Sequence, residues 1–361
     1  MPKQTKQGLK EIALAADVSV ATVSRVASRS NRVSPQIQER VREAALRLRI
    51  DLTLRCKTKA LAFVLSNRDM LHPFHSRVLV GSQANCATRG WDIIFMSFQY
   101  SVTAPWKEIQ LPRVLRRREI ARAVILAGTN SQNLLELLTY REIPFAVLGN
   151  NVIGEWKADL YDRVFYDDVG GTSEMTRYLQ TLGHRHIWFV GNTIFPWATR
   201  SYLGYMQAME DAGLPPHLVT IDSMDEIEVG YLGAKTLLSR REPATAIMGA
   251  TDVTVQGIYK AVDDCGLSIP DDVSVVGSND TYAPLLHPPL TTIREFPEQL
   301  GKSLVELVLN RIAHPDLGPQ QVTIPTEIVK RESCRQLSSR KEGADEGQLK
   351  GELGGLVLKS N

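Results

Sequence analysis

Residues 19–26 read SVATVSRV and combine small and hydroxylated side chains with one long cation. On a helical wheel, one side of this run is apolar and the other presents small or polar groups around Arg25. Small side chains let a helix backbone approach a DNA duplex closely, and an arginine can donate two hydrogen bonds to one guanine. The run therefore predicts a short helix that lies in the major groove. The side expected to face DNA is formed by Ala21, Ser24, Arg25 and Ser28, with Val20 at its leading edge.

Two further helices can hold this one in place. Apolar residues recur at helical spacing from Leu9 to Ala16 and stop at Asp17, so we expect a first helix there. Ser19 can cap the second helix, and Ser34 with Pro35 opens a third. The predicted buried stripe of the third helix is Ile37, Val41, Ala44 and Leu48. Residues 1–50 thus predict an all-α helix-turn-helix domain, although an ordinary helical hairpin would show a similar pattern.

Charge is divided unevenly along the chain. Residues 1–59 hold 13 Lys and Arg against 5 Asp and Glu, a net charge of +8, while the remainder holds 29 against 35, a net charge of −6. The whole-chain value of +2 hides this split. A basic head on a mildly acidic body is expected of a module that neutralises phosphates, so the charge favours double-stranded DNA as the partner of the head.

The composition narrows the remaining classes of protein. The 361 residues include no apolar run of the roughly 18 residues that a membrane span needs, and the start of the sequence has no secretory signal. We therefore expect a cytoplasmic protein without membrane contact. The four cysteines are scattered, and we find no metal-ligand spacing, Gly-rich phosphate loop or nucleophile motif. We accordingly expect no metal, no cofactor and no catalytic activity.

From Lys59 onward, short apolar runs alternate with longer amphipathic stretches. Four runs predict the strands of a first parallel sheet, at 60–67, 91–98, 122–128 and 143–150. The cycle then restarts, and five further runs predict a second sheet, at 162–168, 186–192, 218–224, 245–252 and 273–280. Two doubly wound parallel sheets imply an α/β body with two lobes, in which ligands bind beyond the carboxyl ends of the strands. Those ends are rich in Ser, Asn and Asp, which suits a small polar molecule.

Several blocks of the chain resemble the LacI/GalR family of transcription regulators. They are VSVATVSRV in the head, TLGHRHIWFVG (181–191), RSYLGY (200–205), SIPDDVSVVGSND (268–280) and PPLTTI (288–293). The resemblance extends from about residue 8 to about residue 330. It implies a homodimeric regulator, of repressor type, with a helix-turn-helix head on a periplasmic-binding-protein-like body over residues 60–330. It further implies a near-palindromic DNA operator and a small effector bound between the two lobes.

The family's residue roles carry over position by position. Val20 and Ala21 match the two specificity positions of the recognition helix, and Arg25 matches a third base-contacting position. Positions that usually contact phosphates are matched by Ser19, Thr22 and Ser24. Arg200 matches an arginine that reaches the effector, and Phe74, expected in a loop after the first strand, matches an aromatic residue that often flanks it. The alternative roles are a surface arginine at a helix start and an aromatic residue of the core.

The chain departs from the family pattern at three effector positions. Thr251 stands where an asparagine usually precedes the aspartate, which is here Asp252. Asn279 replaces the first acid after the strand predicted at 273–280, and Asn150 stands where an aspartate commonly ends an earlier strand. Two carboxylates have thus become amides, which donate as well as accept hydrogen bonds, so recognition of sugar hydroxyls should differ from the usual pattern. We expect these four residues to bind a small polar effector, a sugar or a derivative of one. The alternative is a regulator that takes a protein co-regulator instead of a small molecule.

The connection between head and body also departs from the family. Family members usually carry an Asn-Pro start and an Ala-Arg-x-Leu-like stretch, which forms a hinge helix whose leucine wedges into the minor groove. Here residues 48–59 read LRIDLTLRCKTK, a stretch about five residues shorter and without proline. Leu54 is placed like the wedge. We therefore expect a shortened hinge over 51–59, with weaker coupling between effector and operator or a different half-site spacing.

Two other classes of protein share parts of these patterns. A solute-binding protein of a transporter would share the body but needs an export signal. An enzyme is suggested by His184, His186 and acid pairs such as Asp167-Asp168, but the histidines lie where a helix gives way to a strand and are expected to be structural, and the pairs to be turn acids. The last segment, 331–361, is rich in Gly, Ser, Glu, Lys and Arg and predicts a disordered, solvated tail.

Overall fold

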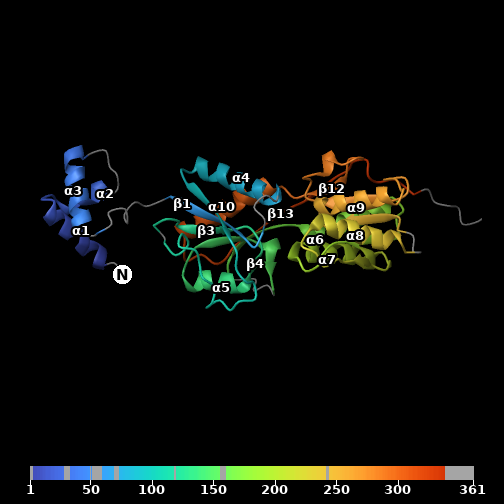
Figure 1. The fold of residues 1–361 in the computed structure, drawn as a ribbon, viewed down its shortest axis with the longest axis horizontal. Coiled ribbons are helices and arrows are strands. Elements are labelled where there is room, and N and C mark those ends of the chain that lie inside the picture. Colours follow the sequence, from blue (N-terminus) through green and yellow to red (C-terminus); the bar gives the residue numbers. More distant parts are fainter. Residues whose placement is uncertain are drawn as a thin grey trace, which may run out of the picture. The chain divides into compact units, whose positions relative to one another are not determined.

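The computed structural model describes residues 3–27, 33–48, 50, 59–68, 73–117, 119–154, 160–240 and 244–337. The chain divides into two compact units. Unit 1 comprises Met1–Asp168, Thr193–Arg200 and Glu295–Glu327, and unit 2 comprises Val169–Asn192, Ser201–Arg294 and Ile328–Asn361. Figure 1 shows the helices and strands of each unit. In the described part of the chain, no helix combines the length and the hydropathy required to cross a membrane.

The amino-terminal head is a three-helix bundle, as the sequence predicts. Its helices are α1 (Lys3–Ala15), α2 (Val20–Ala27) and α3 (Pro35–Arg47). Its core is formed by the apolar residues of the expected spacing, among them Leu9, Ile12, Val23, Val26, Val41 and Ala44. The first helix begins six positions earlier than expected. The buried stripe of α3 differs from the prediction at its last position. The helix ends at Arg47, so Leu48 is 40% exposed, and Ala45 is buried instead.

The body of unit 1 is built on a six-stranded sheet with the order β13-β7-β5-β3-β1-β2. All neighbouring strands in it are parallel. The strands are β1 (Ala60–Ser66), β2 (Asp92–Phe98), β3 (Ala123–Leu126), β5 (Phe145–Leu148), β7 (Asp162–Tyr166) and β13 (Gln321–Ile324). Helices α4 (Pro73–Thr88) and α10 (Pro297–Ala313) pack on one face, and α5 (Gln132–Tyr140) packs on the other. A separate pair of short parallel strands, β4 (Asn130–Ser131) and β6 (Val152–Ile153), follows β3 and β5.

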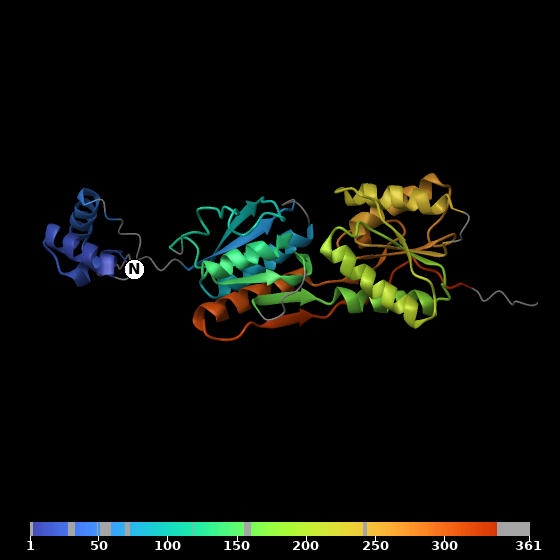
Figure 2. The same ribbon diagram turned by 90° about the horizontal axis from the view of Figure 1, so that it is seen from below.

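Unit 2 is built on a second six-stranded sheet with the order β14-β12-β11-β10-β8-β9. The strands are β8 (Ile187–Val190), β9 (His217–Val219), β10 (Ala246–Gly249), β11 (Ser274–Ser278), β12 (Thr291–Arg294) and β14 (Glu327–Val329). Helices α8 (Glu226–Leu238) and α9 (Asp252–Asp264) cover one face of this sheet. Helices α6 (Asp168–Thr181) and α7 (Pro196–Asp211) lie on the other face (Figure 2). Both sheets are doubly wound, as the alternation of apolar runs predicts.

The assignment of one strand to a sheet was wrong in the sequence analysis. The run 162–168 was expected to open the second sheet, but it forms β7 of the first sheet, paired with β5 through Ala146 and Asp162. Its other neighbour is β13, which comes from a part of the chain about 160 residues later. Along the sequence, the chain therefore returns to unit 1 after it has passed through most of unit 2. Local hydropathy identifies a strand but does not determine its neighbours.

The carboxyl-terminal segment also differs from the prediction. Residues 331–337 were expected to belong to a solvated tail, yet they pack on unit 2. The Ser333 hydroxyl is buried and donates to the carbonyl of Val275 (2.6 Å), and the Leu337 N–H donates to the carbonyl of Leu182 (2.8 Å). The rest of the predicted tail, 338–361, lies outside the described residues.

Candidate functional site

The second helix of the head presents the residues that the sequence assigned to DNA contact. Val23, Val26 and Ala27 are buried, while Val20, Ala21 and Arg25 are exposed on the opposite side. Ser19, immediately before the helix, is exposed, and Thr22 and Ser24 are half-buried. The structure therefore places short side chains and one arginine together on one accessible helix face.

Two polar contacts fix the start of this helix. The Ser19 Oγ accepts a hydrogen bond from the Thr22 N–H (3.0 Å) and lies 2.9 Å from the Thr22 hydroxyl, so Ser19 caps the helix as expected. From α3, the Arg40 guanidinium donates to the carbonyl of Ala16 (2.6 Å) and lies 3.7 Å from the carboxylate of Asp17. Asp17 adopts a positive φ of 50°, which an aspartate tolerates in a turn. The role of Arg40 could not be predicted from the sequence, because a single arginine on an amphipathic helix carries no signal of a partner 24 residues away.

In unit 1, Asn150 is buried and joins the ends of two strands. It lies in a short 3-10 turn that follows β5. Its amide Nδ2 donates to the carbonyl of Tyr166 (2.9 Å) and to the Asp168 carboxylate (2.8 Å), and its Oδ1 accepts from the Tyr166 N–H (3.0 Å). Both amide hydrogens and the amide oxygen thus have protein partners at the carboxyl ends of β5 and β7.

Arg200 binds the same aspartate. Its Nε and Nη2 form a bidentate pair with the Asp168 carboxylate, at 2.7 to 3.0 Å, and the carboxylate is almost completely buried. Burial lowers the pKa of Arg200, but the hydrogen bonds and the charge of Asp168 outweigh this and raise it overall. The guanidinium also lies 5.2 Å from the centre of the Phe165 ring. Asp168, expected to be a turn acid, is therefore the partner that brings Asn150 and Arg200 together.

A cavity of about 320 Å³ opens beside this group. Its lining includes Arg200 and Phe165, together with Gln321 and Thr323 of the neighbouring strand β13. The side chain of Arg200 is 26% exposed, so a small ligand can reach it. The cavity can offer a ligand the donor groups of Arg200 and of the Gln321 amide, next to the Phe165 ring.

Phe74 lies elsewhere in the fold than expected. It was predicted in a loop, but it occupies the first turn of α4, because Pro73 begins that helix. The ring is buried and makes edge contacts with Tyr166 (5.7 Å between ring centres) and with His75 (5.3 Å). Phe74 is thus part of the core of unit 1. It contacts Tyr166, whose backbone is hydrogen-bonded to Asn150.

Unit 1 contains an aromatic group that the sequence analysis missed. The rings of Phe195 and Trp197 are stacked with their centres 4.6 Å apart. The Arg68 guanidinium, just after β1, lies 4.3 Å from the centre of the Trp197 ring, a cation–π distance. Nothing in the spacing of FPW at 195–197 could indicate a partner in the loop after β1.

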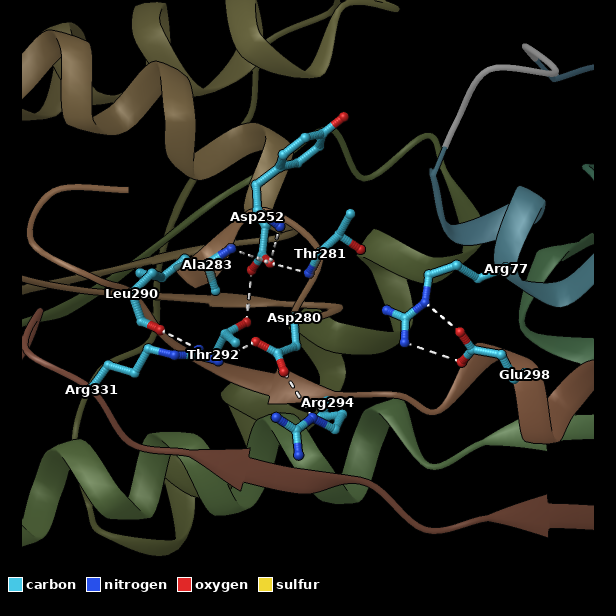
Figure 3. A network of polar contacts seen from close by, with 11 residues as sticks. Arg77, Asp252, Asp280, Thr281, Ala283, Leu290, Thr292, Arg294, Glu298 and Arg331 are labelled. Atoms are coloured by element: carbon cyan, nitrogen blue, oxygen red, sulfur yellow. Dashed lines mark hydrogen bonds and ion pairs between the residues drawn. The ribbon is translucent and has the colours of Figure 1, made fainter. Parts of the chain in front are cut away.

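In unit 2, Asp252 is a buried anchor for the turn after β11 (Figure 3). Its Oδ2 accepts from the backbone N–H groups of Thr281 (2.8 Å), Tyr282 (3.3 Å) and Ala283 (3.2 Å), and its Oδ1 accepts from the Thr292 hydroxyl (2.7 Å). Burial raises the pKa of Asp252 to about 6, although these hydrogen bonds lower it. The carboxylate is thus occupied within unit 2.

The two neighbours of Asp252 in the predicted site are also buried. Thr251 caps α9 by accepting from the Thr254 N–H (3.1 Å), and its hydroxyl donates to Glu226 (2.6 Å). Asn279 adopts a positive φ of 93°, and its Oδ1 accepts from the Asp252 N–H (3.3 Å). Thr251, Asp252 and Asn279 are therefore brought together, as the sequence predicts, at the carboxyl ends of β10 and β11.

The acid after Asn279 also has a structural role. The Asp280 carboxylate accepts from Arg294 Nε (2.8 Å) and from Arg331 Nη2 (2.6 Å), so it ties β12 and the carboxyl-terminal segment to the end of β11 (Figure 3). Separately, in unit 1, the Arg77–Glu298 pair (2.7 Å) in the same figure joins α4 to α10.

The other positions considered in the sequence are the histidine pair, the possible metal ligands and the hinge. The His184 ring is buried and its Nε2 lies 3.2 Å from the carbonyl of Arg335, and burial lowers the pKa of His184. No cluster of three or more His, Cys, Asp or Glu suited to a metal ion occurs in the described part of the chain. Leu54 and the predicted hinge residues 51–58 lie outside the described residues.

Comparisons with known proteins agree on both parts of the chain. Residues 8–49 match the family model of bacterial regulatory proteins of the lacI family, and residues 176–334 match the periplasmic binding protein-like domain. The HTH-type transcriptional repressor PurR of Haemophilus influenzae (strain PittEE) is 27% identical over 345 residues, covering 91% of this chain and 99% of the relative.

Two solved structures have a similar fold over most of their length. One is the lac repressor dimer bound to operator and the anti-inducer ONPF, with a TM-score of 0.70 and 20% identity, covering 90% of this chain and 98% of that one. The other is a complex of the transcriptional regulator CelR with cellobiose, with a TM-score of 0.65 and 23% identity, covering 90% and 99%.

Proposed function

Because the chain belongs to the LacI family of bacterial regulatory proteins, we propose that it is a sequence-specific DNA-binding transcription regulator of the repressor type. The observation that carries this proposal is the exposed face of α2, where Val20, Ala21 and Arg25 stand together on a head with a net charge of +8. Such a face fits the major groove, and the basic head supplies the phosphate neutralisation that DNA binding needs. We infer no catalytic step, and we place the protein in the cytoplasm, where bacterial DNA lies.

The head is suited to direct readout of bases. Arg25 can donate to both acceptors of one guanine, and the short side chains of Val20 and Ala21 allow contact with base edges. The Ser19 hydroxyl caps α2, and Arg40 binds the turn that precedes α2. These contacts hold the helix in one orientation within the head. A preorganised helix loses little conformational entropy when it docks.

One head is too small for tight specific binding, because single modules bury about 600 to 1,000 Å². We infer that two subunits act together on a near-palindromic operator, as in the dimeric lac repressor that the fold resembles. Unit 2 exposes several large apolar side chains that a second copy can cover, among them Met224, Ile227 and Leu285. Symmetric homodimers use the same surface patch on both subunits.

We propose that a small polar effector, a sugar or a derivative of one, regulates DNA binding. The cavity beside Arg200, with its donors and its aromatic wall, supports this proposal, as does the cellobiose complex of the similar CelR structure. By linkage, an effector that binds the operator-bound form better than the free form tightens DNA binding, and an effector with the opposite preference weakens it.

A regulator without a small ligand is the second candidate. It is favoured by one observation: Asn150, Thr251, Asp252 and Asn279 are all buried and hydrogen-bonded within their own units. In this case a protein co-regulator would supply the control. Operator affinity measured with a library of sugars and sugar derivatives separates the candidates, because only the first predicts a change with a small molecule.

Selection of bound duplexes from a random library, with the purified full chain, tests the DNA-binding proposal. The expected result is an enriched near-palindrome. Arg25→Ala should then weaken binding by about 1 to 3 kcal/mol and relax the base preference at one position in each half-site. Arg42→Ala, on α3, serves as a matched control that leaves base preference unchanged. No preference for any duplex over random competitor at moderate salt, across the ligand library, would contradict the proposal.

A further inference from the structure

One segment of unit 1 is strongly basic although the body as a whole is acidic. Residues 101–122 hold six Lys and Arg against two Glu, whereas the chain after residue 59 has a net charge of −6. We call this stretch the basic segment. Its arginines play no part in the groups around Asn150 or Arg200, so the proposed function leaves them unexplained.

The basic segment is held firmly in place by its apolar residues. Ile109, Leu111, Leu115 and Ala121 are buried in the core between the sheet and α5. Between these anchors, Arg113, Arg116 and Arg117 are exposed. Within the described residues, none of these three arginines forms an ion pair. The fold therefore fixes the backbone while directing three positive charges to solvent.

The basic segment starts after the carboxyl end of β2 and runs to the amino ends of the strands, where two contacts hold it. The Trp106 ring packs on Tyr140, the last residue of α5, with ring centres 4.8 Å apart. At the other end of the segment, the Arg122 N–H donates to the carbonyl of Ala60 (2.8 Å), the first residue of β1. In Figure 2 this stretch reaches the end of the sheet where β1 begins. The opposite end of the sheet carries Asn150 and Asp168.

The head is joined to this same end of the sheet. Ala60 follows Lys59, and only residues 51–58 separate Lys59 from Ile50 of the head. Eight residues span at most about 29 Å, even when fully extended. DNA presents one phosphate charge about every 1.7 Å along its axis, so a duplex held by the head extends well past its base contacts. The short linker thus keeps the basic segment within reach of phosphates that flank the half-site.

We propose that Arg113, Arg116 and Arg117 form a second, sequence-independent contact surface for the DNA backbone. This proposal rests on the DNA-binding function proposed above and assigns part of the binding energy to the body of unit 1. The arginines neutralise phosphates and read no bases, so they add affinity and salt dependence without changing specificity. The shortened linker allows this contact, because it limits the distance between the body and a duplex that the head binds.

The test compares two variants of equal charge loss. The first carries Arg113→Gln, Arg116→Gln and Arg117→Gln. The control carries Arg177→Gln, Arg185→Gln and Lys302→Gln, three exposed cations away from the basic segment. Affinity for the duplex selected by the full chain, extended to about 40 base pairs, and for a random duplex of the same length is measured across a range of salt concentrations.

Each lost phosphate contact lowers the slope of log affinity against log salt by about 0.9, so two subunits should lose on the order of 2 to 5 in slope with the first variant. The control should keep the wild-type slope, and base preference should be unchanged in both variants. Replacing the same three arginines by lysine should retain most of the slope, because phosphate neutralisation needs only the charge. Trimming the duplex to the half-sites should remove the difference between wild type and the first variant.

An unchanged slope for the first variant overturns this inference, as does an equal loss in the control. Circular dichroism and thermal unfolding confirm that each variant is folded. If the triple glutamine variant unfolds, the single variants Arg113→Gln, Arg116→Gln and Arg117→Gln, each expected to lower the slope by a smaller amount, keep the test valid. If the wild-type chain binds the selected duplex with sequence preference but the slope does not change, only the second contact surface fails. If the wild-type chain shows no preference for any duplex, the proposed function itself fails.

Discussion

Replacing Asp252 by asparagine tests how unit 2 accommodates a buried charge. Burial raises the pKa of Asp252 from its ordinary value of 3.8 to about 6, although hydrogen bonds from the Thr292 hydroxyl and three backbone N–H groups lower it. Between these two values, the folded protein holds a proton that the unfolded chain has released, so the free energy of unfolding falls as the pH rises. Two pKa units, at 1.36 kcal/mol each, make this loss about 3 kcal/mol.

Asp252→Asn removes the titration but keeps the shape. Its amide oxygen can accept the backbone N–H groups, and its amide nitrogen can donate to the Thr292 oxygen. We therefore expect the stability of the variant relative to wild type to increase by about 3 kcal/mol between about pH 4 and about pH 7. Urea unfolding at each pH, followed by circular dichroism, measures this difference, and hydrogen exchange of the α9 amides confirms that unit 2 is the part affected.

Thr292→Val extends the same test. It removes the hydrogen bond that Oδ1 of Asp252 accepts, and this raises the pKa of Asp252 further. The free energy of unfolding should then continue to fall up to a higher pH than in wild type. Parallel pH profiles for wild type and Asp252→Asn would refute the reasoning, because they would mean that Asp252 releases its proton equally easily in the folded and unfolded chain.

Three further changes have defined outcomes. Ser19→Ala removes the cap of α2 and should lower the stability of the head by about 0.5 to 2 kcal/mol, measurable by thermal unfolding, with weaker operator binding. Arg200→Ala leaves the buried Asp168 carboxylate without its bidentate partner and should cost about 3 to 5 kcal/mol in urea unfolding, whereas Arg200→Lys should cost less; equal losses would argue against a charge effect. Gly257→Ala places a methyl group against the backbone carbonyl of Ile227 where α8 and α9 cross, and should destabilise unit 2 by about 3 kcal/mol or more, seen as faster hydrogen exchange in both helices.

Local patterns predicted most elements of the fold because burial acts on short stretches of chain. The spacing of Leu9, Ile12 and Val41 identified the core of the head, and the apolar runs identified nine of the twelve described strands of the two sheets, all but β12, β13 and β14. The sheet to which 162–168 belongs could not be read in this way. One neighbour of β7 is a strand about 160 residues away, and the Asp162–Arg311 ion pair (2.8 Å), which ties β7 to α10, joins residues 149 positions apart.

The same limit applies to the candidate site. Sequence reasoning identified Asn150 and Arg200 separately, but not Asp168, the aspartate that both of them bind. It also placed Phe74 in a loop, since the pattern around it does not distinguish a helix start from a loop. Contacts across long sequence separations set the chemistry of this site, and a single sequence does not reveal them.

The asparagine at position 150 follows from these contacts. Its amide donates to the Asp168 carboxylate at 2.8 Å and to the carbonyl of Tyr166, so an aspartate there would face two acceptors with no hydrogen to give. We therefore predict that Asn150→Asp destabilises unit 1 by about 3 to 5 kcal/mol at neutral pH, because it adds an uncompensated buried charge.

The loss should be smallest near pH 4. There a shared proton can bridge the two carboxylates, whereas the unfolded chain releases its protons as the pH rises through their ordinary range. Urea unfolding from about pH 4 to about pH 8 measures this trend, with Gln110→Glu, an amide-to-acid change at an exposed residue of unit 1, as the control for an added acid. If Asn150→Asp were as stable as wild type at every pH, Asp168 would not require a donor at this position, and the change from acid to amide would need another cause.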